Sequence, residues 1–356
     1  FHFLITFFND AKLWNYFSIY LPFPALKHEK MFTFAGKLHI NNFSCIMANV
    51  IKIKKGLDIN LKGKASDVLL NGGKSESYAI VPDYYNGILP KVVAKVGEKV
   101  KAGSVLMIDK NRPEIKFVSP VSGEVTAVNR GEKRKVLSIV VKPDAQIEYE
   151  EFGKKNVASL QGAEVKEVLL NAGMWPFIKQ RPYDIVAAPL DTPRDIFVSA
   201  FYSAPLAPNF DFIVKGQEAD FQTGLNALAK LTNGKVYVGV RSGSVVSGMK
   251  GVEIVEVEGP HPAANVGVQI NHIKPVNKGE VVWTVNPADV IVIGRLFNKG
   301  VADFSRMVAI TGSETTERGY VKTISGCTIK SLVNGKVLGQ EHIRIISGNV
   351  LTGTKV

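Results

Sequence analysis

Residues 89–141 carry the clearest pattern of apolar and polar positions in the chain. Three segments place apolar and β-branched residues at the two-residue period of half-buried strands. These segments are Lys91–Val96, Ser104–Ile108 and Val118–Val125. Gly97, Gly103 and Gly123 stand where the chain must turn between or within them. The pattern predicts a small β-sandwich that folds over itself.

Residues 50–63 (VIKIKKGLDINLKG) alternate apolar and polar positions up to Gly56 and again up to Gly63. This alternation predicts a pair of strands joined to the sandwich. The segment from Pro143 to Lys155 is polar and acidic, and we expect it to end the first domain.

Helical and strand patterns alternate after residue 155. Apolar residues on one face, or an Asn-Pro start, predict helices over Val165–Ala172, Glu218–Leu231 and Asn286–Leu296. Short apolar runs predict buried strands over Asp184–Ala188 and Ile196–Ala200, and further strands are predicted over Lys235–Val240 and Val252–Glu258. Such alternation is typical of an α/β domain with a Rossmann-like sheet. Beyond Ser305, strands followed by a short helix indicate the start of a β-grasp module.

The first segment, Phe1–Ile46, is crowded with aromatic residues that follow neither a helical nor a strand period. Its apolar runs are broken by Pro22 and Pro24, so none reaches the roughly 20 residues that a membrane-spanning helix needs. It also lacks the basic start and the cleavage site of a signal peptide. We therefore expect a non-native or disordered leader before a protein that starts at Met47.

Together these patterns predict an α+β multidomain protein. Residues 1–46 are the leader, and residues 47–155 are a β barrel-sandwich hybrid. Residues 156–304 form the Rossmann-like α/β domain, and residues 305–356 begin a β-grasp (SLBB-like) domain that we expect to be truncated at its C-terminus.

The formal net charge of +12 is dispersed along the chain. Basic residues cluster at Lys52–Lys55 and Lys133–Lys135, without interleaved aromatic residues or a known nucleic-acid-binding motif. We therefore expect no nucleic-acid partner. A basic surface that faces acidic partner subunits or anionic lipid headgroups explains the charge equally well.

Cofactor signatures are missing from the sequence. Cys45 and Cys327 have no metal-ligand spacing, which argues against a metal site or an iron–sulfur cluster. No GxGxxG motif follows a predicted strand, and Asn71–Ser75 is no phosphate-binding loop because Val68 stands where its first glycine should be. We expect neither a nucleotide in the α/β domain nor a recognisable catalytic residue.

Three segments combine residue types that suit a ligand. In Met174–Tyr183, aromatic faces and a cation could hold a planar, partly polar molecule, or the same aromatic residues could plug a domain junction. The turn Asp83–Gly87 is a second aromatic site, or else a surface turn. His261 lies between two prolines and could face a ligand or simply hydrogen-bond within its turn.

The sandwich resembles the biotinyl/lipoyl type, which carries its cofactor on a lysine at a hairpin tip. Here the equivalent position holds Arg112, and Lys110 lies off register. We therefore expect a scaffold or docking domain with no covalently bound cofactor, while a biotinyl/lipoyl-type carrier protein stays an alternative.

Seven segments in order resemble the A subunit of the Na⁺-translocating NADH:quinone oxidoreductase, which is related in fold to the C subunit of the Rnf complex. The segments are Ile53–Gly63, Val96–Lys110, Ser122–Arg134, Gly173–Tyr183, Leu231–Gly239, Glu258–Gly267 and Ile346–Thr354. Ala264 departs from the family, which usually has glycine there.

The resemblance implies a peripheral subunit without a transmembrane segment, on the cytoplasmic face of the bacterial inner membrane. It implies that the partner subunits hold flavins, an iron–sulfur cluster and NADH, and that electrons pass to ubiquinone or menaquinone with Na⁺ export. Quinone is then the substrate, and the residues expected to bind it are Tyr85, Gly87, Ile88, Trp175, Phe177, Arg181, Tyr183 and His261. A structural docking subunit of the same complex, with no ligand of its own, is the alternative.

Overall fold

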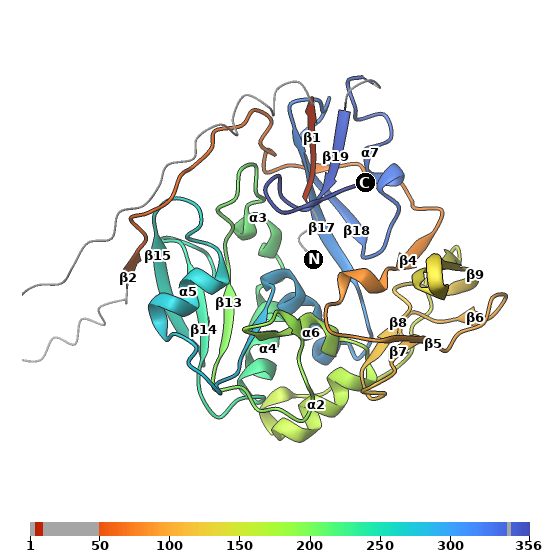
Figure 1. The fold of residues 1–356 in the computed structure, drawn as a ribbon, viewed down its shortest axis with the longest axis horizontal. Coiled ribbons are helices and arrows are strands. Elements are labelled where there is room, and N and C mark those ends of the chain that lie inside the picture. The colour runs from red at the N-terminus through yellow and green to blue at the C-terminus, as the bar shows by residue number, and fades with distance from the viewer. Residues whose placement is uncertain (1–3, 10–49, 340–342) are drawn as a thin grey trace, which may run out of the picture.

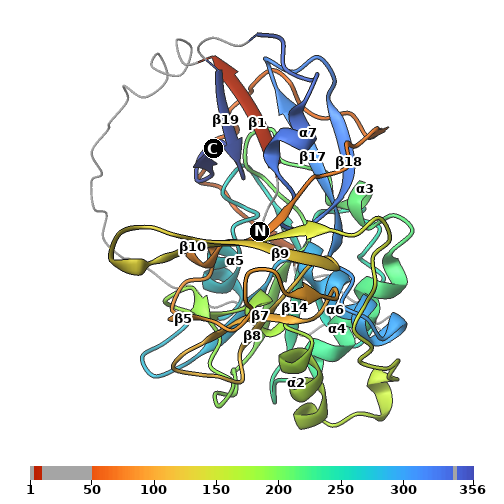
Figure 2. The same cartoon turned by 90° about the vertical axis from the view of Figure 1, so that its right-hand side faces the viewer.

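A computed structural model describes residues 4–9, 50–339 and 343–356 and groups them into three parts (Figure 1). In Figures 1 and 2 one sheet lies at the top of the molecule, and the α/β domain and the sandwich lie below it. None of the helices in the described ranges is both long enough and apolar enough to cross a membrane.

The sandwich consists of two small antiparallel sheets with the strand orders β4-β10-β9-β6 and β5-β7-β8. The strands are β4 (Tyr78–Ile80), β5 (Pro90–Val92), β6 (Lys99–Val100), β7 (Val105–Asp109), β8 (Lys116–Val118), β9 (Gly123–Arg130) and β10 (Val136–Pro143). Gly123 has φ +153°, and a Cβ there would lie 1.9 Å from the Lys142 carbonyl oxygen, so only glycine allows β9 and β10 to pair at this point. The predicted sandwich is confirmed.

The predicted strand pair at residues 50–63 is wrong. Only β2 (Val50–Lys52) is a strand in this segment, and it pairs with the α/β sheet instead of the sandwich. A short β3 (Leu69–Leu70) joins the third sheet. Period-two alternation marks a strand, but it does not specify the sheet edge that the strand will join.

The α/β domain contains a seven-stranded sheet of order β12-β11-β16-β13-β14-β15-β2. Its strands are β11 (Ile178–Arg181), β12 (Ile185–Val186), β13 (Ile196–Ser199), β14 (Val236–Val240), β15 (Glu253–Glu258) and β16 (Val282–Val285). The strands β16, β13, β14, β15 and β2 run parallel. This arrangement confirms the Rossmann-like prediction.

Helices cover both faces of this sheet. They are α2 (Gly162–Asn171), α3 (Phe210–Val214), α4 (Glu218–Ala229), α5 (Val266–Ile273) and α6 (Pro287–Lys299). The side chains of β13 alternate between two clusters, because Ile196 and Val198 pack with α4 and α6 while Phe197 packs with Ile270 of α5. A Cβ on Gly294 of α6 would lie 1.7 Å from the Asp220 carbonyl oxygen of α4, so this glycine permits the close helix packing.

The third sheet has the order β20-β19-β1-β17-β18-β3. Its remaining elements are β1 (Leu4–Asn9), β17 (Ser305–Gly312), β18 (Gly319–Ile324), β19 (Ile343–Ser347), β20 (Thr354–Lys355) and the short helix α7 (Ile329–Val333). Strand β1 runs parallel to β17 and antiparallel to β19. The expectation that the first 46 residues lie outside the fold is therefore wrong for Leu4–Asn9. The rest of that predicted leader lies outside the described residues.

Candidate functional site

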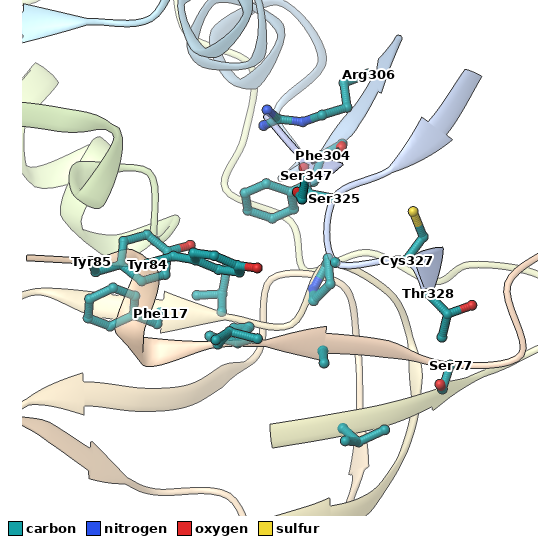
Figure 3. Close-up of a pocket in the computed structure, with 18 of the residues that line it drawn as sticks. Ser77, Tyr84, Tyr85, Phe117, Phe304, Arg306, Ser325, Cys327, Thr328 and Ser347 are labelled. Atoms are coloured by element: carbon teal, nitrogen blue, oxygen red, sulfur yellow. Dashed lines mark hydrogen bonds between the residues drawn. The ribbon is translucent and has the colours of Figure 1, made fainter. Parts of the chain in front are cut away.

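The three parts of the molecule enclose a cavity of about 340 Å³, called here the junction cavity. Figure 3 shows Tyr84, Tyr85 and Phe117 on one side of it and Phe304, Arg306 and Cys327 on the other. Its walls are mostly apolar, and the Tyr84 hydroxyl points toward its interior (Figure 3). Apolar pockets of this size with a few polar groups are the usual form of small-molecule sites.

A tight turn places the two tyrosines. Pro82, which is buried, starts a short 3-10 helix over Pro82–Tyr84, and the Tyr85 amide donates to the Pro82 carbonyl oxygen. The Tyr85 ring meets Phe117 of β8 edge to face at 4.7 Å between ring centroids. Burial, reinforced by the nearby charge of Asp289, raises the pKa of Tyr85 far above its ordinary value, so its hydroxyl stays protonated.

The opposite wall comes from the α/β domain and the third sheet. Phe177 ends a second 3-10 turn and meets Phe304 edge to face at 6.1 Å. Burial raises the pKa of the Cys327 thiol, although a hydrogen bond with Thr323 and the Arg306 charge oppose this.

Arg306 brings a positive charge to the cavity from an otherwise uncharged strand, β17. Its Nη2 donates to Oδ1 of Asp289 at 3.0 Å, and both side chains are at most 5% exposed. Asp289 lies in the first turn of α6. This buried ion pair therefore ties the third sheet to the α/β domain beside the cavity.

A second and larger cavity of about 750 Å³ adjoins the first. It is called here the sheet groove because β11, β13 and β16 line it, and it shares Tyr84 and Phe177 with the junction cavity. Its other residues include Lys179, Arg181 and Asp184. The groove is therefore polar and charged where the junction cavity is aromatic.

The structure brings only some of the predicted quinone-binding residues together. Tyr85 and Phe177 line the junction cavity, and Arg181 lines the sheet groove. Tyr183 is 80% exposed and lines neither cavity.

Trp175 needs a correction, because it cannot offer a ring face to either cavity. Its side chain is fully buried, its Nε1 donates to the Ala187 carbonyl oxygen at 2.8 Å, and its ring meets Trp283 edge to face at 5.4 Å. Of the two interpretations of this segment, the domain-junction plug describes Trp175.

His261, Gly87 and Ile88 also lie outside both cavities. His261 Nδ1 is 3.0 Å from the Ser203 hydroxyl, and its backbone N–H donates to Asp58. Gly87, at φ +80°, offers its carbonyl oxygen to Arg112, and Ile88 packs against the main core.

Arg112, at the position of the carrier lysine, is tied down. It donates to Asp109 at 2.7 Å and to the carbonyl oxygens of Val186 and Gly87 at 3.0 and 2.8 Å. The hairpin tip between β7 and β8 is therefore docked on the α/β domain, unlike the free arm that a carrier needs. This is the geometry expected of a scaffold.

Sequence reasoning missed Phe117, Phe304, Arg306 and Cys327 as neighbours of the two tyrosines. One signal was present, because Arg306 is a single charge in the apolar run of β17. A buried charge in such a strand requires a partner and so marks an interior contact. The described part of the chain holds no group of three or more His, Cys, Asp or Glu side chains that could bind a metal ion.

Family models match nearly all of the chain after residue 50. The NqrA N-terminal barrel-sandwich hybrid domain matches residues 51–144, the NqrA second alpha/beta domain matches residues 160–302, and the NQRA C-terminal domain matches residues 307–356.

Relatives that are named as the A subunit of Na(+)-translocating NADH-quinone reductase agree with these matches. The protein of Photorhabdus laumondii is 37% identical over 310 residues, which is 86% of this chain and 69% of that protein. The protein of Hahella chejuensis is 38% identical over 309 residues, 85% of this chain and 69% of that protein. The chain belongs to this NqrA family. The resemblance and the predicted fold class are thereby confirmed.

One solved structure is also similar, that of an NAD+-reducing [NiFe]-hydrogenase in the air-oxidized state. Its TM-score is 0.31 and its identity 10%, over 55% of this chain and 45% of that chain. A similarity of this degree supports no conclusion about this member of the NqrA family.

Proposed function

We propose that this chain serves as the A subunit of a Na⁺-translocating NADH:quinone reductase and that its junction cavity contributes to quinone binding. The proposal rests on the family and on one observation, the aromatic cavity where the three domains meet. The complex would pass electrons from NADH to ubiquinone or menaquinone and export Na⁺. The flavins, the iron–sulfur cluster and the NADH site would belong to partner subunits at the cytoplasmic face of the bacterial inner membrane.

The cavity suits the chemistry of a quinone ring. The ring is flat and apolar on both faces, which the rings of Tyr84, Tyr85 and Phe117 can cover. Its two carbonyl oxygens need hydrogen-bond donors, and the Tyr84 hydroxyl and the Arg306 guanidinium line the same space. Reduction to the quinol takes up two electrons and two protons, which make each carbonyl oxygen a hydroxyl. In this proposal the electrons come from partner subunits, and the chain itself only binds and orients the ring.

The test is binding of a short-chain ubiquinone to the purified chain by titration calorimetry. Tyr84→Ala removes a ring face and a hydroxyl, so we expect at least a tenfold loss of affinity, which corresponds to about 1.4 kcal/mol. Tyr183→Ala is the matched control because that tyrosine is exposed and outside the cavity. Circular dichroism should stay native for both variants.

The same titration decides between this proposal and the alternative of a pure docking role. No heat of binding from the unaltered chain, or equal affinities of both variants, would leave docking as the better account.

A further inference from the structure

The sheet groove lies where an open α/β sheet usually binds a ligand. The connection from β13 passes through α3 and α4 to β14 on one side, whereas α5 leads back to β16 on the other side of β13. The helices α4 and α5 cover opposite faces, so the winding reverses between β13 and β16. Ligands of such sheets bind outside the carboxyl ends of the strands at this switch point. Ser199 of β13 and Val285 of β16, both at those ends, line the groove.

Two cations of β11, the strand next to the outermost strand β12, line the groove. Lys179 pairs with Thr284 in the strand register and Arg181 with Val282, so both basic side chains lie on the same face as α5. Asp184 is their only close carboxylate in the described residues, at a distance of 3.5 Å from each. Its single negative charge cannot neutralise both.

The other acidic group of the groove is already balanced. Asp289 pairs with Arg306, which reaches it from the junction cavity. The charged side chains around the groove, with Arg306 included, therefore sum to one excess positive charge. The Arg181 Nε is buried and makes no hydrogen bond within the described residues, although 30% of the side chain is exposed. Asp184 reaches this nitrogen only as an ion-pair partner at 3.5 Å, so a ligand oxygen at hydrogen-bond distance would add an acceptor that the described residues do not supply.

Backbone donors lie on the other wall. Asn265 starts α5, but its side chain makes no capping bond, and the N–H groups of Val266 and Gly267 have no acceptor in the part of the chain that the structure describes. Both residues line the groove. The space beside the Gly267 Cα is open, since a Cβ there would meet nothing within 4 Å.

From these observations we propose that the sheet groove binds the phosphoryl group of an organic phosphate, with Lys179 and Arg181 as its charged partners. A planar guanidinium, an ammonium and uncapped helix amides together form a typical donor set for phosphate oxygens. The prediction of no nucleotide rested on missing glycine loops, and these donors replace such a loop. The phosphate could belong to a soluble nucleotide or to a phospholipid headgroup. Either one would leave the rest of the ligand near Tyr84 and Phe177, which also line the groove.

The experiment uses the full chain and two probes. Calorimetry compares ADP with uncharged adenosine, and sedimentation compares phosphatidylcholine vesicles with and without phosphatidylglycerol. We expect Lys179→Gln to weaken binding of the responding probe about tenfold and Lys179→Arg to restore most of it. Lys99→Gln is the matched control, since Lys99 also has a long ion pair, at 3.7 Å to Glu124, but lies on the sandwich.

Each outcome decides something. Binding of ADP alone identifies a soluble phosphate, and binding of the charged vesicles alone identifies a lipid headgroup. Binding of neither probe, or an equal loss in Lys99→Gln, overturns the proposal. Titration of Lys179→Gln with short-chain ubiquinone tests the two sites separately. If this variant loses phosphate binding but keeps its quinone affinity, the phosphate site can fail without affecting the junction cavity.

Discussion

The junction cavity and the sheet groove share Tyr84 and Phe177 yet differ in chemistry. The first is built where three domains pack, so rings from distant segments line it, among them Phe117 and Phe304. The second is built on one sheet, so strand-end polar groups and the charges of Lys179 and Arg181 line it. Domain packing therefore creates an aromatic site, and sheet topology creates an anion site, in two neighbouring cavities.

The largest effect should come from Trp175→Ala, which removes a fully buried ring that packs on Trp283. Truncating a buried tryptophan costs about 3–5 kcal/mol of the free energy of unfolding. Urea unfolding measures this loss, and Leu190→Ala, at an exposed position, should stay within about 0.5 kcal/mol. Quinone affinity of the folded variant should not change. A weaker affinity with unchanged stability would instead return Trp175 to the binding site.

Breaking the ion pair of Arg306 and Asp289 should lower the free energy of unfolding almost as much. Arg306→Ala leaves the Asp289 carboxylate buried without its guanidinium, which typically costs about 3–5 kcal/mol. A double-mutant cycle with Asp289→Asn should show strong coupling, because each single change removes the same contact. The exposed pair of Lys235 and Glu253 provides the control, where Lys235→Ala should cost at most about 1 kcal/mol. Additive losses in the cycle would contradict a direct pairing.

Arg112→Ala should have a medium effect and act on one cavity only. The variant loses three hydrogen bonds from a partly exposed charged donor, and because water replaces part of them we expect a total cost of about 1.5–3 kcal/mol, while Asp109 keeps its bonds from backbone amides. Since Arg112 holds the Gly87 carbonyl beside the tyrosine turn, quinone affinity should fall while ADP or vesicle binding stays unchanged. Arg112→Lys should rescue only part of the loss, because an ammonium lacks the planar fork. Full rescue by lysine would show that charge alone matters.

The smallest effect is protection of Cys327 from alkylation. Burial raises the pKa of this thiol, so its reaction with iodoacetamide should be slow at pH 7 and accelerate as the pH rises toward that raised pKa. In a Cys45→Ser background, short-chain ubiquinone should slow the labelling, and ADP should not. Mass spectrometry follows the adduct, with the urea-unfolded chain as the fast reference. Equal protection by both compounds would show that the two cavities act as one site.

Local patterns predicted the elements well. The structure confirms helices at α2, α4 and α6 and strands at β13, β14 and β15, each within a few residues of its expected bounds. The sequence predicted less well which strands pair with each other in a sheet. The strands β1, β2 and β3 all join sheets that their own residues do not specify. Strand pairing depends on which edge is free after the larger sheets form, and that information is not local.

The residues of the two cavities likewise divide into those that local sequence predicted and those that only the packing of the domains revealed. The sequence by itself determined the family, the domain types, the tyrosine turn and the aromatic segment around Phe177, because these depend on contiguous residues. Only the tertiary structure decided that Trp175 faces the core, that Tyr183 faces solvent, and that Arg306 and Cys327 reach Tyr84 across more than 200 residues of chain. The reason is physical: the direction of a side chain and its distant neighbours follow from how whole domains pack, which no local period encodes.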